Sequence, residues 1–162
     1  MILPAHISEL AAKLGASLTN KKLWITTAES CTGGGISYAL TDTAGSSAYI
    51  DRCFVTYSND AKHELLGVKQ EILEQFGAVS KETIEQMVDG AINATNADVA
   101  IAVSGIAGPG GGTKDKPVGT VWIAVKVLDK LSVEHCLFAG GRSEVRLQVI
   151  EYSLKKVIEL IN

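Results

Sequence analysis

Apolar residues recur along much of the chain at the spacing of amphipathic helices. The first such segment carries Ile7, Leu10, Ala11 and Leu14 on one face, and we expect this helix to end near Gly15. Further helices are predicted over 36–40, 59–66, 71–76, 80–92 and 142–161. Asn59 and Ser80 precede two of these segments and are their expected N-caps.

Other apolar runs are short and rich in β-branched residues, which is typical of strands. They predict strands over 23–27, 53–57, 99–103, 120–127 and 131–138. The run 99–103 is uninterrupted, which indicates burial on both faces and a central place in the sheet. Only three residues separate the last two strands, so these form an antiparallel hairpin.

The alternation of helices and strands predicts the architecture. We expect an α/β fold of three layers, α/β/α, around a mixed, mostly parallel five-stranded sheet with one antiparallel strand. No repeat, linker or low-complexity tract divides residues 1–162, so a single domain is expected.

Composition narrows the classes of partner. The chain has 162 residues, 46% of them hydrophobic, and a net charge of −3 without long charged runs. This gives no electrostatic footprint for nucleic acid or for an anionic membrane. No apolar run reaches about 18 residues and no secretory signal is visible, so we expect a cytoplasmic protein. The apolar content leaves room for a homo-oligomeric interface.

Three cysteines, Cys31, Cys53 and Cys136, are widely spaced and include no C-x-x-C pair. This argues against a disulfide framework and against a zinc site. We expect Cys53 and Cys136 to be buried free thiols. No metal and no other cofactor is predicted.

Residues 28–35, read as AESCTGGG, connect the first predicted strand to a helix. A strand-to-helix turn lifts Ser30 off the strand end, and its glycines let backbone N–H groups point at an oxyanion or phosphate. The alternative is that Ser30 is only an N-cap.

Two more strand ends carry polar or glycine-rich residues, at 57–62 and 104–112. Ligands bind outside the carboxyl ends of parallel strands, so these segments should meet Ser30 at one edge. Lys62 or Tyr57 could supply the base that a serine nucleophile needs. Alternatively, Lys62 is a solvated lysine and Tyr57 an aromatic cover over the core.

Three motifs, at 28–35, at 103–111 (VSGIAGPGG) and at 117–121 (PVGTV), closely resemble the CinA C-terminal domain family. Its members include nicotinamide mononucleotide (NMN) deamidases of the PncC type. The resemblance covers nearly the whole chain. Longer members carry a further N-terminal domain, and we expect this chain to be the stand-alone form.

The resemblance implies hydrolysis of NMN to nicotinic acid mononucleotide and ammonia. Ser30 is the implied nucleophile, with Tyr57 and Lys62 moving protons. Backbone donors of Thr32, Gly33 and Gly34 would hold the oxyanion. Glu29 would either orient this turn or balance the charge of the pyridinium ring. The ring itself withdraws electrons from the amide, so no metal is required.

The remaining glycines and one arginine are candidates for substrate binding. Residues 105–119 are either a substrate clamp or a linker between strands, and the clamp would use Gly105, Gly108, Gly110 and Gly111. Arg142, in the first turn of the last helix, opposes the helix dipole unless it binds a phosphate. Ser104 stands where the family often has threonine. Cys31 is a competing nucleophile whose side chain should point away from Ser30.

Two alternatives to an NMN deamidase remain open from the sequence. The chain could be a catalytically silent nucleotide-binding or damage-response accessory protein of the same fold. It could also be an amidase for a different substrate. Meeting of Ser30, Tyr57 and Lys62 within hydrogen-bond reach would favour an enzyme.

Overall fold

A computed structural model describes residues 2–162. The helices are α1 (Ala5–Lys21), α2 (Gly35–Thr41), α3 (Asn59–Leu66), α4 (Gln70–Phe76), α5 (Lys81–Thr95) and α6 (Arg142–Ile161), with a 3₁₀ turn, η1 (Ser46–Ala48). The strands are β1 (Ile25–Glu29), β2 (Phe54–Val55), β3 (Val99–Gly105), β4 (Thr120–Val127) and β5 (Lys130–Leu137). The five strands form one sheet in the order β2-β1-β3-β4-β5.

Strand direction in this sheet confirms the predicted mixed α/β fold. β1 pairs in parallel with β2 and with β3, whereas β4 is antiparallel to both of its neighbours, β3 and β5. One strand therefore runs against the other four. β3 lies in the centre of the sheet, as its uninterrupted apolar run predicts.

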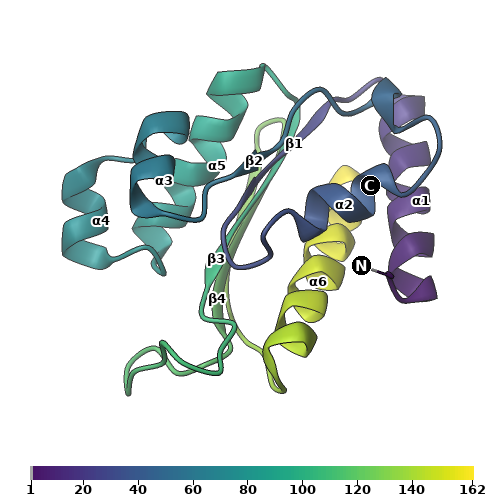
Figure 1. Cartoon of the computed structure of the whole chain (residues 1–162). Helices are drawn as coiled ribbons and strands as arrows, with labels where there is room; N and C mark the ends of the chain where they lie inside the picture. The colour runs from purple at the N-terminus through teal and green to yellow at the C-terminus, as the bar shows by residue number, and fades with distance from the viewer. Residues whose placement is uncertain (1) are drawn as a thin grey trace.

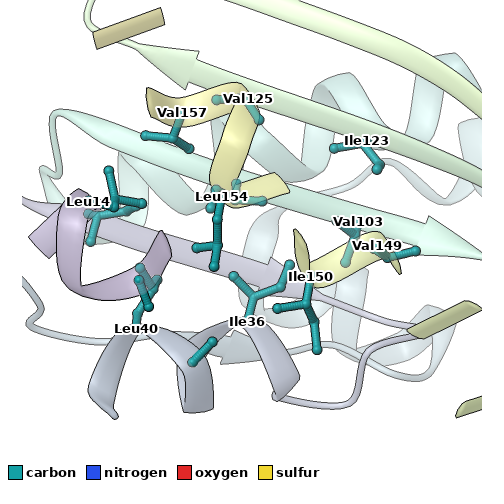
Figure 2. Close-up of a cluster of buried hydrophobic side chains, with 14 of the residues drawn as sticks. Leu14, Ile36, Leu40, Val103, Ile123, Val125, Val149, Ile150, Leu154 and Val157 are labelled. Atoms are coloured by element: carbon teal, nitrogen blue, oxygen red, sulfur yellow. The ribbon is translucent and has the colours of Figure 1, made fainter. Parts of the chain in front are cut away.

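Helices cover both faces of the sheet (Figure 1), with α1, α2 and α6 on one side and α3, α4 and α5 on the other. The first side buries large β-branched residues of the strands, such as Val103, Ile123 and Val125, against Val149, Leu154 and Val157 of α6. Figure 2 shows these side chains meeting Leu14 of α1 and Ile36 and Leu40 of α2. This is the larger of the two apolar clusters.

The opposite face of the sheet carries small residues. Side chains alternate along a strand, and here the alternate positions are alanines, namely Ala28, Ala100, Ala102 and Ala124. They let α5 lie close to the sheet and bury Ile84, Met87 and Val88. α3 packs in turn on α5, where a Cβ at Gly90 would lie 2.0 Å from the Leu66 carbonyl oxygen.

Some predicted boundaries are wrong. α1 continues past Gly15 to Lys21, because Gly15 is a helical position that makes room for the Tyr49 ring. The N-cap of α3 is Ser58, whose hydroxyl accepts the Ala61 N–H, and not Asn59. β1 begins two residues later than expected and β2 is only two residues long. Ser80 caps α5 as predicted.

The structure also bears on two smaller expectations, one about the cysteines and one about membrane-spanning segments. Cys53 and Cys136 are free thiols but only half-buried, so the prediction that they are buried is wrong. Within residues 2–162, no helix is long and apolar enough to cross a membrane.

Candidate active site

A cavity of about 230 Å³ opens at the carboxyl edge of the parallel strands. Its walls come from the ends of β1, β2 and β3, from the loop before α5 and from the start of α6. The lining residues are Ser30, Cys31, Tyr57, Lys62, Ala78, Val79, Ser104, Gly105, Ala107 and Arg142. The three strand ends that the sequence singled out therefore do meet at one place.

Ser30 and Lys62 are in direct contact in this cavity. Lys62 Nζ lies 3.1 Å from Ser30 Oγ. Ser30 follows β1 directly, and its N–H donates to the Val103 carbonyl, which continues the β1–β3 pairing by one residue. Lys62 reaches the same point from α3, so the sheet and one short helix fix the pair.

The Lys62 side chain is almost fully buried, with 1% of the residue exposed. Its ammonium donates to the Thr56 carbonyl at 2.8 Å, and the Tyr57 carbonyl lies 3.4 Å away. Loss of hydration lowers the pKa of Lys62 from 10.5 to about 8. About a tenth of this amine is therefore neutral at pH 7, and the neutral share, which is able to accept a proton, rises to about half at pH 8.

The turn after Ser30 is tight and internally bonded. The Gly33 N–H donates to the Ser30 carbonyl, and Gly33 and Gly34 both have positive φ angles of 59° and 92°. Thr32, Gly33 and Gly34 are not among the residues that line the cavity. The geometry therefore does not support these three N–H groups as oxyanion donors.

Glu29 is completely buried beneath this turn. Its carboxylate accepts hydrogen bonds from the Thr32 and Thr27 hydroxyls, from the Ile36 and Ser37 N–H groups and from the Ser37 hydroxyl. A carboxylate at the first turn of a helix is stabilised by the unpaired N–H groups there. Of the two roles expected for Glu29, the contacts favour orientation of the turn.

Tyr57 and Arg142 meet at the mouth of the cavity. The Tyr57 ring is exposed, and its hydroxyl accepts a hydrogen bond from Arg142 at 3.1 Å. The other terminal nitrogen of Arg142 donates to the Gly108 carbonyl at 2.8 Å. Arg142 thus links α6 to the β3–β4 loop and to the end of β2, while Glu144 caps the helix by accepting the Gly141 N–H.

Ser104 lies inside the cavity wall at the end of β3. It is 1% exposed, and its hydroxyl has no hydrogen-bond partner among the described residues. Buried hydroxyls are nearly always paired, so this one is a candidate contact for a ligand.

The glycine-rich loop between β3 and β4 divides into two parts. Gly105 lines the cavity, and Gly108 contributes its carbonyl to Arg142. Gly110 and Gly111 are exposed, in the part of the loop that extends away from the body of the molecule (Figure 1). The structure thus brings the first part of the predicted clamp to the site and leaves the tip outside it.

Cys31 also lines the cavity, although its side chain belongs to the apolar cluster under α6. Burial raises the pKa of this thiol from 9.0 to about 12. A thiol reacts as the thiolate, so Cys31 is a poor nucleophile here.

Three residues of the site region were not predicted from the sequence. Ala78 and Val79 line the cavity, and Arg146 contacts the turn after Ser30. Nothing distinguishes the first two in the sequence. Arg146 could have been found, because it lies one helical turn after Arg142. No cluster of three or more potential metal ligands occurs among residues 2–162.

Comparison with known proteins shows to which family the chain belongs. The sequence model of one protein family, described as the CinA C-terminal domain, matches residues 7–161. The chain belongs to the CinA C-terminal domain family. A relative from Enterobacter agglomerans, named nicotinamide-nucleotide amidohydrolase PncC, is 52% identical over 94% of both chains. A relative of the same name from Escherichia coli K12 is 45% identical over 93% of this chain and 92% of its own.

A solved structure of another protein shares the fold of this chain. It is the competence/damage inducible protein CihA from Agrobacterium tumefaciens, with a TM-score of 0.97 and 46% identity over 100% of this chain and 99% of that one.

Proposed function

We propose that this CinA-family protein is an amidohydrolase that converts NMN to nicotinic acid mononucleotide and ammonia, with Ser30 as nucleophile. The contact between Ser30 Oγ and a buried Lys62 amine is the observation that carries the proposal. The names of the full-length relatives support the substrate class.

The first half of the reaction forms an acyl-enzyme. Neutral Lys62 takes the proton of the Ser30 hydroxyl as Oγ attacks the carboxamide carbon. The tetrahedral intermediate then collapses, the C–N bond breaks, and the Lys62 ammonium returns its proton to the departing nitrogen, which leaves as ammonia. Lys62 is the base in this proposal because it contacts Ser30, whereas the Tyr57 hydroxyl contacts Arg142.

In the second half, water attacks the ester carbon while Lys62 accepts its proton. The C–O bond to Ser30 breaks, and the proton returns to Ser30 Oγ. Nicotinic acid mononucleotide is released.

Gly105 is our proposed donor to the oxyanion. The Val103 carbonyl faces β1, since it accepts the Ser30 N–H, and Ile106 faces β4, since its N–H donates to the Thr120 carbonyl. Amide groups alternate sides along a strand, so the Gly105 N–H faces the side of Ser30. A preorganised donor of this kind contributes about 3 kcal/mol to a transition state.

The size of the cavity indicates how the nucleotide lies. Its volume of about 230 Å³ is below the range of about 300–1,000 Å³ that holds a drug-sized ligand. We propose that the pyridine end enters beside Ser104, while the 5′-phosphate stays at the mouth near Arg142.

Ammonia release from NMN tests this proposal. Ser30→Ala should abolish release and leave the protein folded, because no other group at the site is activated. Cys31→Ala is the matched control and should retain most of the activity, since its thiol is held protonated. Activity should also survive treatment with EDTA.

Other outcomes would decide against parts of the proposal. Full activity in Ser30→Ala would remove Ser30 from the mechanism. No ammonia from NMN with the wild-type protein would favour an accessory role or another amide substrate. Loss of activity with EDTA and its return with added metal would overturn the metal-free mechanism.

A further inference from the structure

Arg146 contacts the turn that follows Ser30 and does not line the cavity. It lies on α6, and one of its terminal nitrogens donates to the Thr32 carbonyl at 2.8 Å. The contact joins parts of the chain 114 residues apart.

The peptide between Thr32 and Gly33 is held from both ends. Its carbonyl accepts from Arg146 and from the Gly35 N–H, and its N–H donates to the Ser30 carbonyl. This peptide therefore ties the Ser30 carbonyl to the Thr32 carbonyl that Arg146 contacts, and it adds to the hold that the β1–β3 pairing already has on Ser30. Among residues 2–162, Arg146 is the only charged side chain that hydrogen-bonds to this peptide.

α6 lies tightly against this turn. A Cβ at Gly33 would be 3.5 Å from the same Arg146 nitrogen, and a Cβ at Gly35 would be 2.7 Å from Ile150 Cδ1. Arg146 and Ile150 are one helical turn apart, so α6 contacts the turn at two successive positions. The helix thus forms a rigid support behind the nucleophile.

Arg146 also brings positive charge to a place where Glu29 brings negative charge. Thr32 connects the two, since its hydroxyl donates to Glu29 and its carbonyl accepts from Arg146. The neighbouring thiol senses both charges, because Glu29 raises the pKa of Cys31 and Arg146 lowers it. A negative charge that develops at Ser30 is subject to the same opposed fields. Among residues 2–162, no hydrogen-bond partner is found for the buried Arg146 Nε, so the bond to Thr32 is made by a terminal nitrogen alone.

We infer that Arg146 is a positioning residue for catalysis, which fixes the Ser30 turn through the Thr32 carbonyl and offsets the charge of Glu29 at the nucleophile. This inference rests on the proposed role of Ser30. Arg146 does not line the cavity, so it should act on the rate of the chemical step and not on substrate binding.

Steady-state kinetics of ammonia release from NMN test the inference. Arg146→Met keeps the unbranched stem and removes both the donor and the charge. We expect kcat to fall about 10- to 100-fold, since a displacement of about 1 Å at a reacting group has an effect of this size. KM should change less than about 3-fold. Arg146→Lys, which keeps the charge, should lose less than Arg146→Met.

Two further measurements separate positioning from general stability. Guanidinium chloride at low millimolar concentration should restore part of the kcat of Arg146→Ala, which a merely structural defect would not allow. Arg52→Ala is the matched control: Arg52 is exposed, pairs with Asp51 and does not line the cavity, so kcat should not change.

Failure of the inference about Arg146 can be distinguished from failure of the proposed function. Wild-type kcat in Arg146→Met, or a loss confined to KM, would overturn the inference while leaving the role of Ser30 intact. A loss without guanidinium rescue that parallels a loss of Tm would do the same. Undiminished activity in Ser30→Ala would instead overturn the proposed function, whatever Arg146 does.

Discussion

Lys62 is a buried amine that lines the cavity beside Ser30, and in the proposed reaction its protonation state decides whether Ser30 can lose its proton. The ammonium form cannot accept a proton, whereas the neutral amine can. Burial brings the pKa of Lys62 down to about 8, into the range where both forms are populated. Removal of water, rather than a neighbouring charge, thus lowers the pKa of the proposed base.

This makes a prediction about pH. If Lys62 is the base, kcat/KM for NMN should rise with pH and level off above an inflection near pH 8, where the amine is mostly neutral. The measurement is ammonia release from pH 6 to 9.5 in buffers of constant ionic strength. A profile that is flat across this range, or that falls as pH rises, would rule out Lys62 as the base.

At the residue scale the sequence predicts which side chains meet, but not what each one contacts. Ser30, Lys62 and Ser104 could be placed together because each follows or neighbours the end of a parallel strand. The direction of the Tyr57 ring toward Arg142 could not be predicted, because it depends on how far α6 stands from β2. The expected oxyanion donors, Thr32, Gly33 and Gly34, remain a prediction that the cavity lining does not support, because glycine permits a turn but does not show which N–H groups bond within it.

At the scale of elements, α6 connects two segments beside the cavity, the β3–β4 loop and the segment after β2. Its first turn supplies Arg142, which holds the Gly108 carbonyl of the β3–β4 loop and the Tyr57 hydroxyl beyond β2. Both partners are neutral acceptors, of which Tyr57 is exposed and Gly108 is buried. A phosphate is a stronger acceptor for a guanidinium than either, because its hydrogen bonds are charge-assisted on both sides.

Substrate preference tests the role of Arg142. NMN should be hydrolysed far better than nicotinamide riboside or nicotinamide by the wild-type protein. Arg142→Ala should lower kcat/KM for NMN by about 10- to 100-fold, which corresponds to about 1.5–3 kcal/mol for a charged hydrogen bond. The two compounds without phosphate should lose much less. Equal losses on all three would place Arg142 in a structural role.

Element boundaries were predictable where one signal dominated. The bounds of β4 and α6 agree with the prediction because strand alternation and a long amphipathic stripe continue to their ends. α1 was predicted too short because glycine usually ends a helix. Here Gly15 is required by the approach of Tyr49, whose hydroxyl reaches the Leu40 carbonyl, and no local pattern shows that contact.

At the scale of the whole molecule, the buried Lys62 lowers the stability of the fold. Its pKa is about 8 in the folded protein and near 10.5 in an unfolded chain, so below pH 8 both states carry the proton and the folded state bears the full cost of the buried ammonium, a cost that falls as pH rises from 8 to 10.5. The difference corresponds to about 3 kcal/mol at neutral pH. The hydrogen bonds of the ammonium, such as that to the Thr56 carbonyl, offset part of it.

Lys62→Met should therefore inactivate the protein and stabilise it. We expect the free energy of unfolding at pH 7 to rise by about 1–3 kcal/mol, and this gain to shrink as pH rises from 8 toward 10.5, where the unfolded lysine also loses its proton. Urea unfolding at several pH values measures this. Lys81→Met, at an exposed lysine, is the control and should change the free energy by less than about 0.5 kcal/mol. A less stable Lys62→Met protein would show that the ammonium stabilises the fold.

The reversed direction of β4 has a consequence for how this fold can diversify. A parallel fourth strand would require a crossover that carries the chain to the far edge of the sheet. Because β4 is antiparallel, both ends of the glycine-rich loop stay at the edge where Ser30 and Lys62 lie, and the strand pairing is complete without the loop tip. Loops of other lengths could be grafted between β3 and β4 while Ser30 and Lys62 stay in place. Residues 109–116 do not line the cavity, so they are the part of the loop whose length can change without altering the walls around Ser30 and Lys62.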